Sequence, residues 1–154
     1  MYLVECFNVE TVLRVLGVPK QHIRRMKGKG NVLNELKRDP DTEHVGMVDA
    51  DARSANPVPL PPFMLKEDQD GLRLYVWKTH RLVVVHDRIE DWIMAVMVEV
   101  GLELSAFHLP VTDAVGLHRM EMQVMDPRLV SALNEAVKRE SARVQTLRRM
   151  LGIT

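Results

Sequence analysis

Apolar residues occur along the chain in short blocks with two kinds of spacing. Residues 1–4, 44–49 and 81–86 are nearly unbroken apolar runs of strand length. Residues 9–16 and 89–101 instead repeat apolar positions at helical spacing, and a glycine closes each block. Unbroken apolar strands that alternate with amphipathic helices predict an α/β domain with a mainly parallel central sheet flanked by helices.

Other segments in the first two thirds of the chain extend this alternation. Residues 21–25 are predicted to be a short edge strand, residues 31–38 a second helix, and residues 71–79 an alternating strand. The proline-rich stretch 54–63 is predicted to be an extended loop, because proline lacks the N–H group that regular structure requires.

The C-terminal part of the chain predicts helices and no strand. After a loop at 105–126, Asp126 suits a helix cap and Pro127 suits a first helical turn, so one long helix or two should follow. We therefore expect an α/β core at 1–104 and a helical C-terminal extension at 105–154 that packs on the same domain.

Composition narrows the class of protein without choosing a function. The chain has 154 residues, of which 46% are hydrophobic and 27% charged, as in one soluble globular domain. Its 21 basic and 21 acidic residues give a formal net charge of zero, so overall charge points to no partner. The single cysteine, Cys6, excludes an internal disulfide, and the histidines lack zinc-ligand spacing. Without a signal-peptide pattern or a membrane-length apolar run, we expect a cytoplasmic protein with no membrane partner.

Acidic residues stand where two predicted strands end. Glu5 follows the first strand, Asp49 ends the strand at 44–49, and Asp51 follows it with only Ala50 between them. Alternate strand residues share a face, so carboxylates at this spacing repel one another unless a cation neutralises them. Mg²⁺ prefers such oxygen ligands and serves phosphoryl chemistry. The same spacing also occurs in turns whose aspartates accept backbone N–H groups, so a turn and a metal site both stay open.

The strand at 81–86 also ends in polar residues, which gives further candidates near the same sheet edge. His86, Asp87 and Glu90 would support the acidic residues or bind a second metal ion. The alternative for Asp87 and Glu90 is a capping box, since they stand three residues apart before an apolar run. The alternative for His86 is a purely structural role.

A basic stretch around two glycines supplies candidates for phosphate contact. Arg25, Lys27 and Lys29 lie there close together in the sequence. Flexible cations beside a carboxylate-bound metal ion would suit a nucleic-acid backbone. A solvated loop explains the same residues equally well, and no interleaved aromatic side chains indicate base stacking.

Three stretches in this order resemble a Toprim domain, the topoisomerase–primase module. They are YLVECFNVETVLRVL, the basic KGKGNVLNEL and VGMVDADA. The later LVVVHDRIEDWIM is similar to a strand and acidic helix start in small stand-alone Toprim-like proteins. The resemblance covers residues 1–100 and also extends to the Toprim part of overcoming-lysogenization-defect nucleases.

The resemblance implies a Toprim-like core that binds Mg²⁺ or Mn²⁺ and processes nucleic-acid phosphodiesters, in DNA or RNA, as a nuclease does. The family places a glutamate after its first strand and two alternating aspartates after its third. Glu5, Asp49 and Asp51 therefore become the metal ligands, and Glu5 also the general base or acid. Many members have glycine where Cys6 stands, and Arg53 replaces a further alternating aspartate. These departures favour an alternative, a catalytically inactive module of the same fold that binds nucleic acid or a protein. A third possibility is that the fold is the same but the ligand is a nucleotide rather than a polymer. A homodimer or a complex with a protein partner is also compatible with the sequence.

Overall fold

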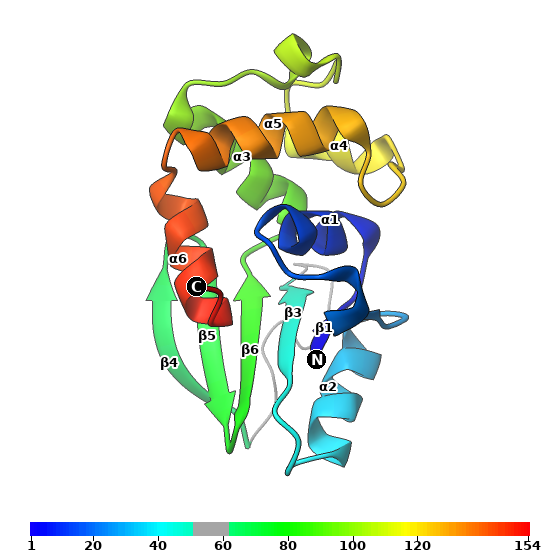
Figure 1. Ribbon diagram of the computed structural model, residues 1–154, viewed down its shortest axis with the longest axis vertical. Coiled ribbons are helices and arrows are strands. Elements are labelled where there is room, and N and C mark those ends of the chain that lie inside the picture. Colours follow the sequence, from blue (N-terminus) through cyan, green and yellow to red (C-terminus); the bar gives the residue numbers. More distant parts are fainter. Residues whose placement is uncertain (51–61) are drawn as a thin grey trace.

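A mixed sheet organises residues 1–50 and 62–154, the part of the chain that the computed structural model describes (Figure 1). Within these residues the strands follow the order β2-β1-β3-β6-β5-β4. Neighbours from β2 to β6 are parallel, whereas β5 is antiparallel to both β6 and β4. The strands are β1 (Tyr2–Val4), β2 (Ile23–Arg25), β3 (Val45–Asp49), β4 (Met64–Gln69), β5 (Leu72–Trp77) and β6 (His80–Val85).

The α/β class is confirmed, but the expectation of a mainly parallel sheet is wrong. Tight turns after β4 and β5 reverse the chain, since Asp70, Gly71 and Lys78 all adopt positive φ. Two-residue turns of this kind join antiparallel strands, and no helix crosses over between them. The edge strand β4 was not predicted, because most of its residues are polar and exposed and show no buried face.

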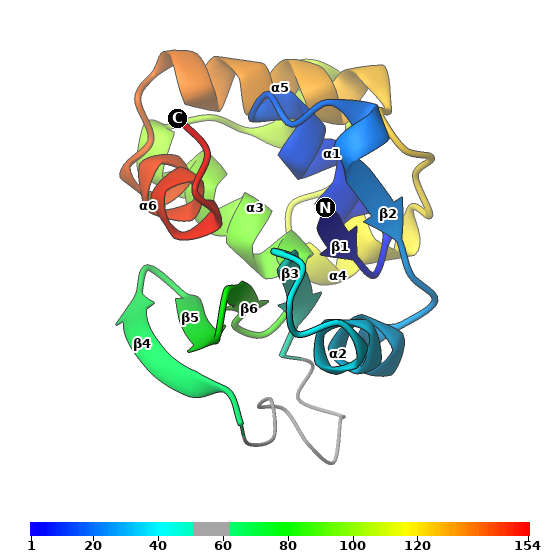
Figure 2. The same ribbon diagram turned by 60° about the horizontal axis from the view of Figure 1, so that its bottom comes forward.

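Helices cover the two faces of the sheet unequally (Figure 2). Helices α1, α3, α5 and α6 lie on one face, where Leu13, Ile93 and Leu147 belong to one buried cluster. Helix α2 lies on the other face, where Val32 and Leu36 are buried. The helices are α1 (Phe7–Val15), α2 (Lys29–Arg38), α3 (Ile89–Val100), α4 (Ala114–Arg119), α5 (Pro127–Lys138) and α6 (Ala142–Leu151).

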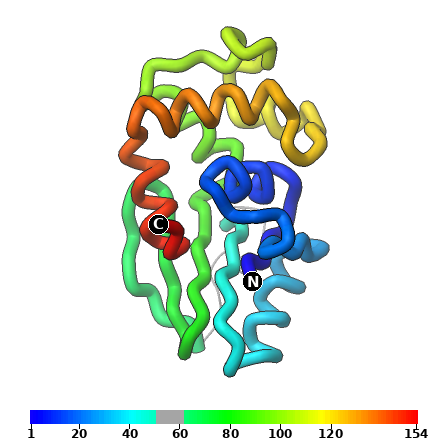
Figure 3. The backbone as a smooth tube through the Cα atoms, viewed as in Figure 1, coloured from blue at the N-terminus to red at the C-terminus, as the bar shows by residue number. Residues whose placement is uncertain are grey.

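The segment between α3 and α5 passes beyond the carboxyl ends of the parallel strands (Figure 3). It contains the short helix α4, which the expectation of a loop at 105–126 missed. The caps of the two helices are alike: the Asp113 side chain accepts the N–H of Gly116 at 2.7 Å, and the Asp126 side chain accepts that of Arg128 at 3.0 Å. The predicted cap at Asp126 is thus confirmed, and α4 packs against α3.

The core reaches from the strands into this C-terminal part. Leu117 of α4 and Leu129 of α5 are completely buried and belong to the same cluster as Val83 of β6. None of the helices in the described part of the chain is long and apolar enough to cross a membrane.

Gly46 in β3 allows α2 to lie close to the sheet. A Cβ atom added there would stand 2.9 Å from Leu82 Cδ1, 3.0 Å from Leu36 Cδ1 and 3.1 Å from Val32 Cγ1. We expect Gly46→Val to lower the free energy of unfolding by about 1–3 kcal/mol, because three side chains must shift in a packed core. Urea unfolding followed by circular dichroism measures this; unchanged stability would contradict the close packing.

Candidate functional site

Glu5 and Asp49 meet at the carboxyl edge of the sheet. Glu5 directly follows β1, Asp49 ends β3, and these strands are parallel neighbours with Val4 opposite Met47. The Glu5 carboxylate accepts a hydrogen bond from the backbone N–H of Asp49. Oδ1 of Asp49 in turn accepts the N–H of Ile89, the first residue of α3, at 2.9 Å. One oxygen of each carboxylate therefore binds the backbone, and the two acidic groups are fixed beside each other.

An open cleft of about 1040 Å³ lies over this edge. Helices α1, α2 and α3 all begin beside it, and the positive ends of their helix dipoles favour negative charge in the cleft. The short helix α4 and the residues after it form the remaining wall. Besides Glu5 and Asp49, the lining consists of Cys6, Phe7, Asn8, Lys29, Arg88, Glu90, His118, Arg119, Glu121 and Met122.

Glu90 is a buried carboxylate in the wall of the cleft, with only 4% of its surface exposed. Its Oε1 accepts the Asn8 side-chain amide at 3.1 Å and lies 3.1 Å from Nδ1 of His118. Three elements, α1, α3 and α4, thus meet at this oxygen. A buried carboxylate requires such partners, since an unpaired charge away from water costs several kcal/mol.

The predicted capping box at Asp87–Glu90 is wrong by one residue. The cap of α3 is Arg88, whose backbone N–H donates to the Asp91 carboxylate at 3.1 Å. Asp87 is exposed and pairs with exposed His86, with 3.4 Å between Oδ1 and Nδ1. Neither lines the cleft. Of these three supporting candidates, the structure brings only Glu90 to the site.

Of the three basic candidates, only Lys29 lines the cleft. Its Nζ donates to the carbonyl of Ala50 at 3.2 Å, which holds the ammonium beside the end of β3. Arg25 instead pairs with Glu10 at 3.2 Å and lies over the Phe7 ring, 4.0 Å from its centroid. Lys27 is exposed and is not part of the lining.

Five polar residues of the cleft were not predicted from the sequence, and one of them is Glu121, just after α4. His118 and Arg119 lie on α4, inside the segment expected to be a loop, and Arg88 stands between two acidic candidates. Asn8 lies in the first turn of α1 and is buried. The available signal for α4 was Asp113, which is a favourable cap for a helix over the residues that follow it.

The Cys6 thiol lines the cleft but stays protonated. The pKa of Cys6 is raised to about 12, mainly by burial; the neighbouring carboxylates of Asp49, Glu5 and Glu90 also raise it, whereas a hydrogen bond from Val9 lowers it. Nucleophilic and metal-binding cysteines need the opposite environment, which favours the thiolate. Cys6 therefore contributes packing and shape to the site.

A metal ion at this edge would depend on residues beyond those described. Asp51 lies outside the described residues, so its predicted role as a ligand stays a prediction. Within residues 1–50 and 62–154, no group of three or more His, Cys, Asp or Glu side chains could hold a metal ion. Glu5 and Asp49 supply carboxylate oxygens, the donors that suit Mg²⁺ and Mn²⁺.

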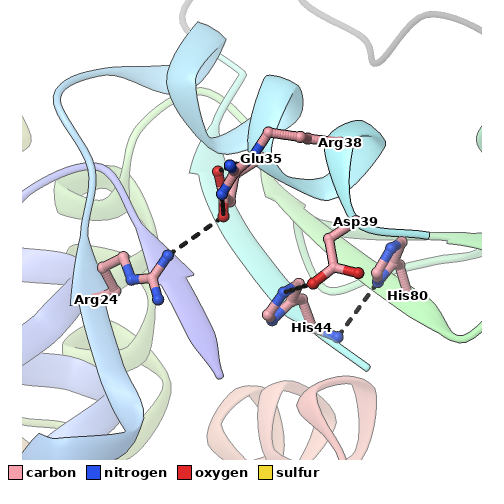
Figure 4. Close-up of polar contacts among 6 residues, drawn as sticks. All are labelled: Arg24, Glu35, Arg38, Asp39, His44 and His80. Atoms are coloured by element: carbon pink, nitrogen blue, oxygen red, sulfur yellow. Dashed lines mark hydrogen bonds and ion pairs between the residues drawn. The ribbon is translucent and has the colours of Figure 1, made fainter. Parts of the chain in front are cut away.

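A second polar cluster lies at the opposite end of the sheet, where β3 and β6 begin (Figure 4). His44 and His80 are buried and their rings are stacked, with centroids 5.6 Å apart and an interplanar angle of 9°. Nδ1 of His80 accepts the backbone N–H of His44 at 3.2 Å. Nε2 of His44 lies 3.7 Å from a carboxylate oxygen of Asp39. Burial is the main cause that lowers the pKa of His44, followed by the positive N-terminus and His80.

The fold and the cleft together define an α/β protein with two carboxylates fixed at the carboxyl edge of a mixed sheet. In comparisons with known proteins, no family model, no curated protein and no solved structure matches the chain.

Proposed function

We propose that the protein is a Mg²⁺-dependent, nuclease-like protein that processes nucleic-acid phosphodiesters at a Toprim-like acidic site. The contact between Glu5 and Asp49 on the floor of the cleft supports this proposal most strongly. These residues follow the first and third strands of the chain, the order that the resemblance to Toprim domains requires. Acidic residues at the carboxyl edge of parallel strands also occupy the usual ligand position of α/β sheets.

The chain's own residues would divide the chemistry between them. Glu5, Asp49 and Asp51 would hold Mg²⁺ or Mn²⁺, which when bound polarises a phosphoryl group and activates water. Glu5 would also assist proton transfer, since it lies beside the reacting group. Lys29 would contact the phosphate, and the starts of three helices would favour its negative charge.

The alternative is a catalytically inactive module of the same origin, which binds nucleic acid or a protein without cleaving it. One observation favours it: Cys6 fills the position directly after the glutamate, where many Toprim domains have glycine, and its side chain lines the cleft. A side chain there limits the approach of a phosphate to the backbone. Metal-dependent cleavage separates the two functions.

Titration calorimetry with Mg²⁺ and Mn²⁺ tests the metal site. We expect the wild type to bind both ions and Asp49→Asn to bind them at least about tenfold more weakly, because the variant loses one ligand charge. The amide oxygen can still accept the N–H of Ile89, so the fold should persist. The matched control is Asp68→Asn, which removes a charge from the exposed edge strand β4.

Each titration should be repeated with a short single-stranded oligonucleotide, whose phosphates would complete a weak site. Equal metal binding by wild type and Asp49→Asn would contradict the proposed site. So would the absence of binding by the wild type in both conditions.

A further inference from the structure

Two arginines in the cleft differ from most other arginines of the protein. Neither Arg88 nor Arg119 has an ion-pair partner among residues 1–50 and 62–154, although the cleft contains several carboxylates. Arg119 is exposed and Arg88 is partly buried. Among the described residues, the arginines that do form ion pairs with a carboxylate are Arg24, Arg25, Arg38, Arg73, Arg128, Arg139, Arg143 and Arg149.

These two arginines stand where the cleft joins a smaller hollow. The hollow has a volume of about 300 Å³ and lies between the start of α3 and α4. Arg88, His118 and Arg119 line both cavities, whereas Glu5 and Asp49 line only the larger one and Asp91 only the smaller one. The two guanidinium groups therefore lie between the smaller hollow and the part of the cleft that contains Glu5 and Asp49.

His118 completes this group. Its Nδ1 lies 3.1 Å from the buried Glu90 carboxylate, which fixes the ring by that nitrogen. Somewhat more than half of its side chain is exposed, so the remainder of the ring faces solvent in the cleft. The Asn8 amide holds the same carboxylate oxygen. The contact with Glu90 therefore positions His118 beside both arginines.

We propose that Arg88, Arg119 and His118 form a phosphate-binding subsite for the phosphate adjacent to the one at Glu5 and Asp49. Guanidinium groups bind phosphate through two parallel hydrogen bonds, and those of Arg88 and Arg119 are not neutralised by a described carboxylate. This inference rests on the proposed function and names its substrate class. The substrate is a nucleic-acid strand that presents at least two consecutive phosphates, and a mononucleotide fills only part of the site.

Binding of two small probes tests the subsite. The probes are thymidine 5′-monophosphate and the 5′-phosphorylated thymidine dinucleotide, titrated by calorimetry with Ca²⁺ in place of Mg²⁺ to suppress cleavage. We expect the wild type to bind the dinucleotide at least about tenfold more tightly than the mononucleotide, because one additional charge-assisted hydrogen bond contributes an affinity gain of this size. Arg88→Gln/Arg119→Gln should bind both probes equally. The matched control, Arg38→Gln/Arg139→Gln, removes two exposed arginines outside the cleft and should keep the preference.

The outcomes separate the subsite from the proposed function. A preference that survives in Arg88→Gln/Arg119→Gln would overturn the subsite, as would a wild type that binds both probes equally or binds neither. Binding of Mg²⁺ is measured on the same proteins. A different result separates the two proposals: the wild type binds no metal ion, but it prefers the dinucleotide, and Arg88→Gln/Arg119→Gln does not. In that case the subsite stands and the metal-dependent function fails. Thermal unfolding of each variant verifies that it is folded, and Arg119→Gln alone repeats the test with an exposed position.

Discussion

Glu5→Gln is expected to lower Mg²⁺-dependent cleavage of nucleic acid by about 100-fold or more, the usual loss when a general acid or base is removed. On the proposed function, the substitution removes the charge of a metal ligand and a proton-transfer group together. It also preserves the fold, because the glutamine carbonyl can accept the Asp49 N–H that Glu5 accepts now. Cleavage of labelled single- and double-stranded DNA and RNA with Mg²⁺ measures the effect and identifies the preferred strand.

The control for this prediction is Glu43→Gln, an exposed residue outside the cleft. It should cleave as the wild type does. Equal activity of Glu5→Gln and the wild type would contradict a catalytic Glu5. If the wild type binds nucleic acid and metal but never cleaves, the inactive binding module becomes the better account of the chain.

As the pH is lowered, the protein is expected to lose stability already above the pH range in which its carboxylates are protonated. Burial lowers the pKa of His44 below its ordinary value of 6.5, so the folded protein keeps this ring neutral. As the pH falls below this value, the unfolded chain takes up a proton that the folded chain does not, and stability falls with pH. Thermal unfolding at about pH 7.5 and about pH 5.5 should therefore give a lower midpoint at the acid pH.

The stacked rings add a geometric reason for this sensitivity. The His80 ring stacks on that of His44 and its Nδ1 accepts the His44 N–H, so a proton on His44 would place a charge against a second buried imidazole. Protonation of the carboxylates affects stability only at lower pH. Hydrogen bonds from Thr42 lower the pKa of Asp39, and a hydrogen bond from the Arg38 side chain lowers the pKa of Glu35. Their stabilising contribution is lost as the pH falls below about 4.

His44→Phe separates the histidine effect from the rest. The phenyl ring can stack on His80 but cannot be protonated, so the difference between the two midpoints should shrink by at least about half. His22→Gln, a change at an exposed histidine, is the control and should leave the difference unchanged. A wild-type midpoint that is the same at both pH values would refute the prediction.

The sequence was most informative about elements that are buried on one or both faces. Strands β3 and β6 and helix α3 were predicted because nearly unbroken apolar runs and helical periodicity arise mainly where side chains pack into a core. Strand β4 has no such pattern, since an exposed edge strand buries little. Helix α4 has only six residues, too few for periodicity to reveal.

The same distinction holds for the candidate site. Glu5 and Asp49 were found because strand ends are visible in the sequence and parallel strands share one edge. His118 was not found from the sequence, because its position beside Glu90 depends on contacts between distant segments of the chain. One of these is the hydrogen bond from the Met125 N–H to the Thr11 hydroxyl, which ties the chain after α4 to α1. No local pattern records such a contact.

The bonds between the first and last elements bear on how the chain folds. The Tyr2 hydroxyl donates to the carbonyl of Leu151, and Arg148 donates to that of Leu16, so α6, which packs on β6, is also tied to β1 and to the end of α1. Contacts between such distant segments form slowly, because a long stretch of chain must first lose its conformational freedom. Until α6 docks, the apolar surface of β6 that it contacts stays partly uncovered and prone to aggregation. We therefore expect a nascent chain to depend on chaperones until α6 has been synthesised.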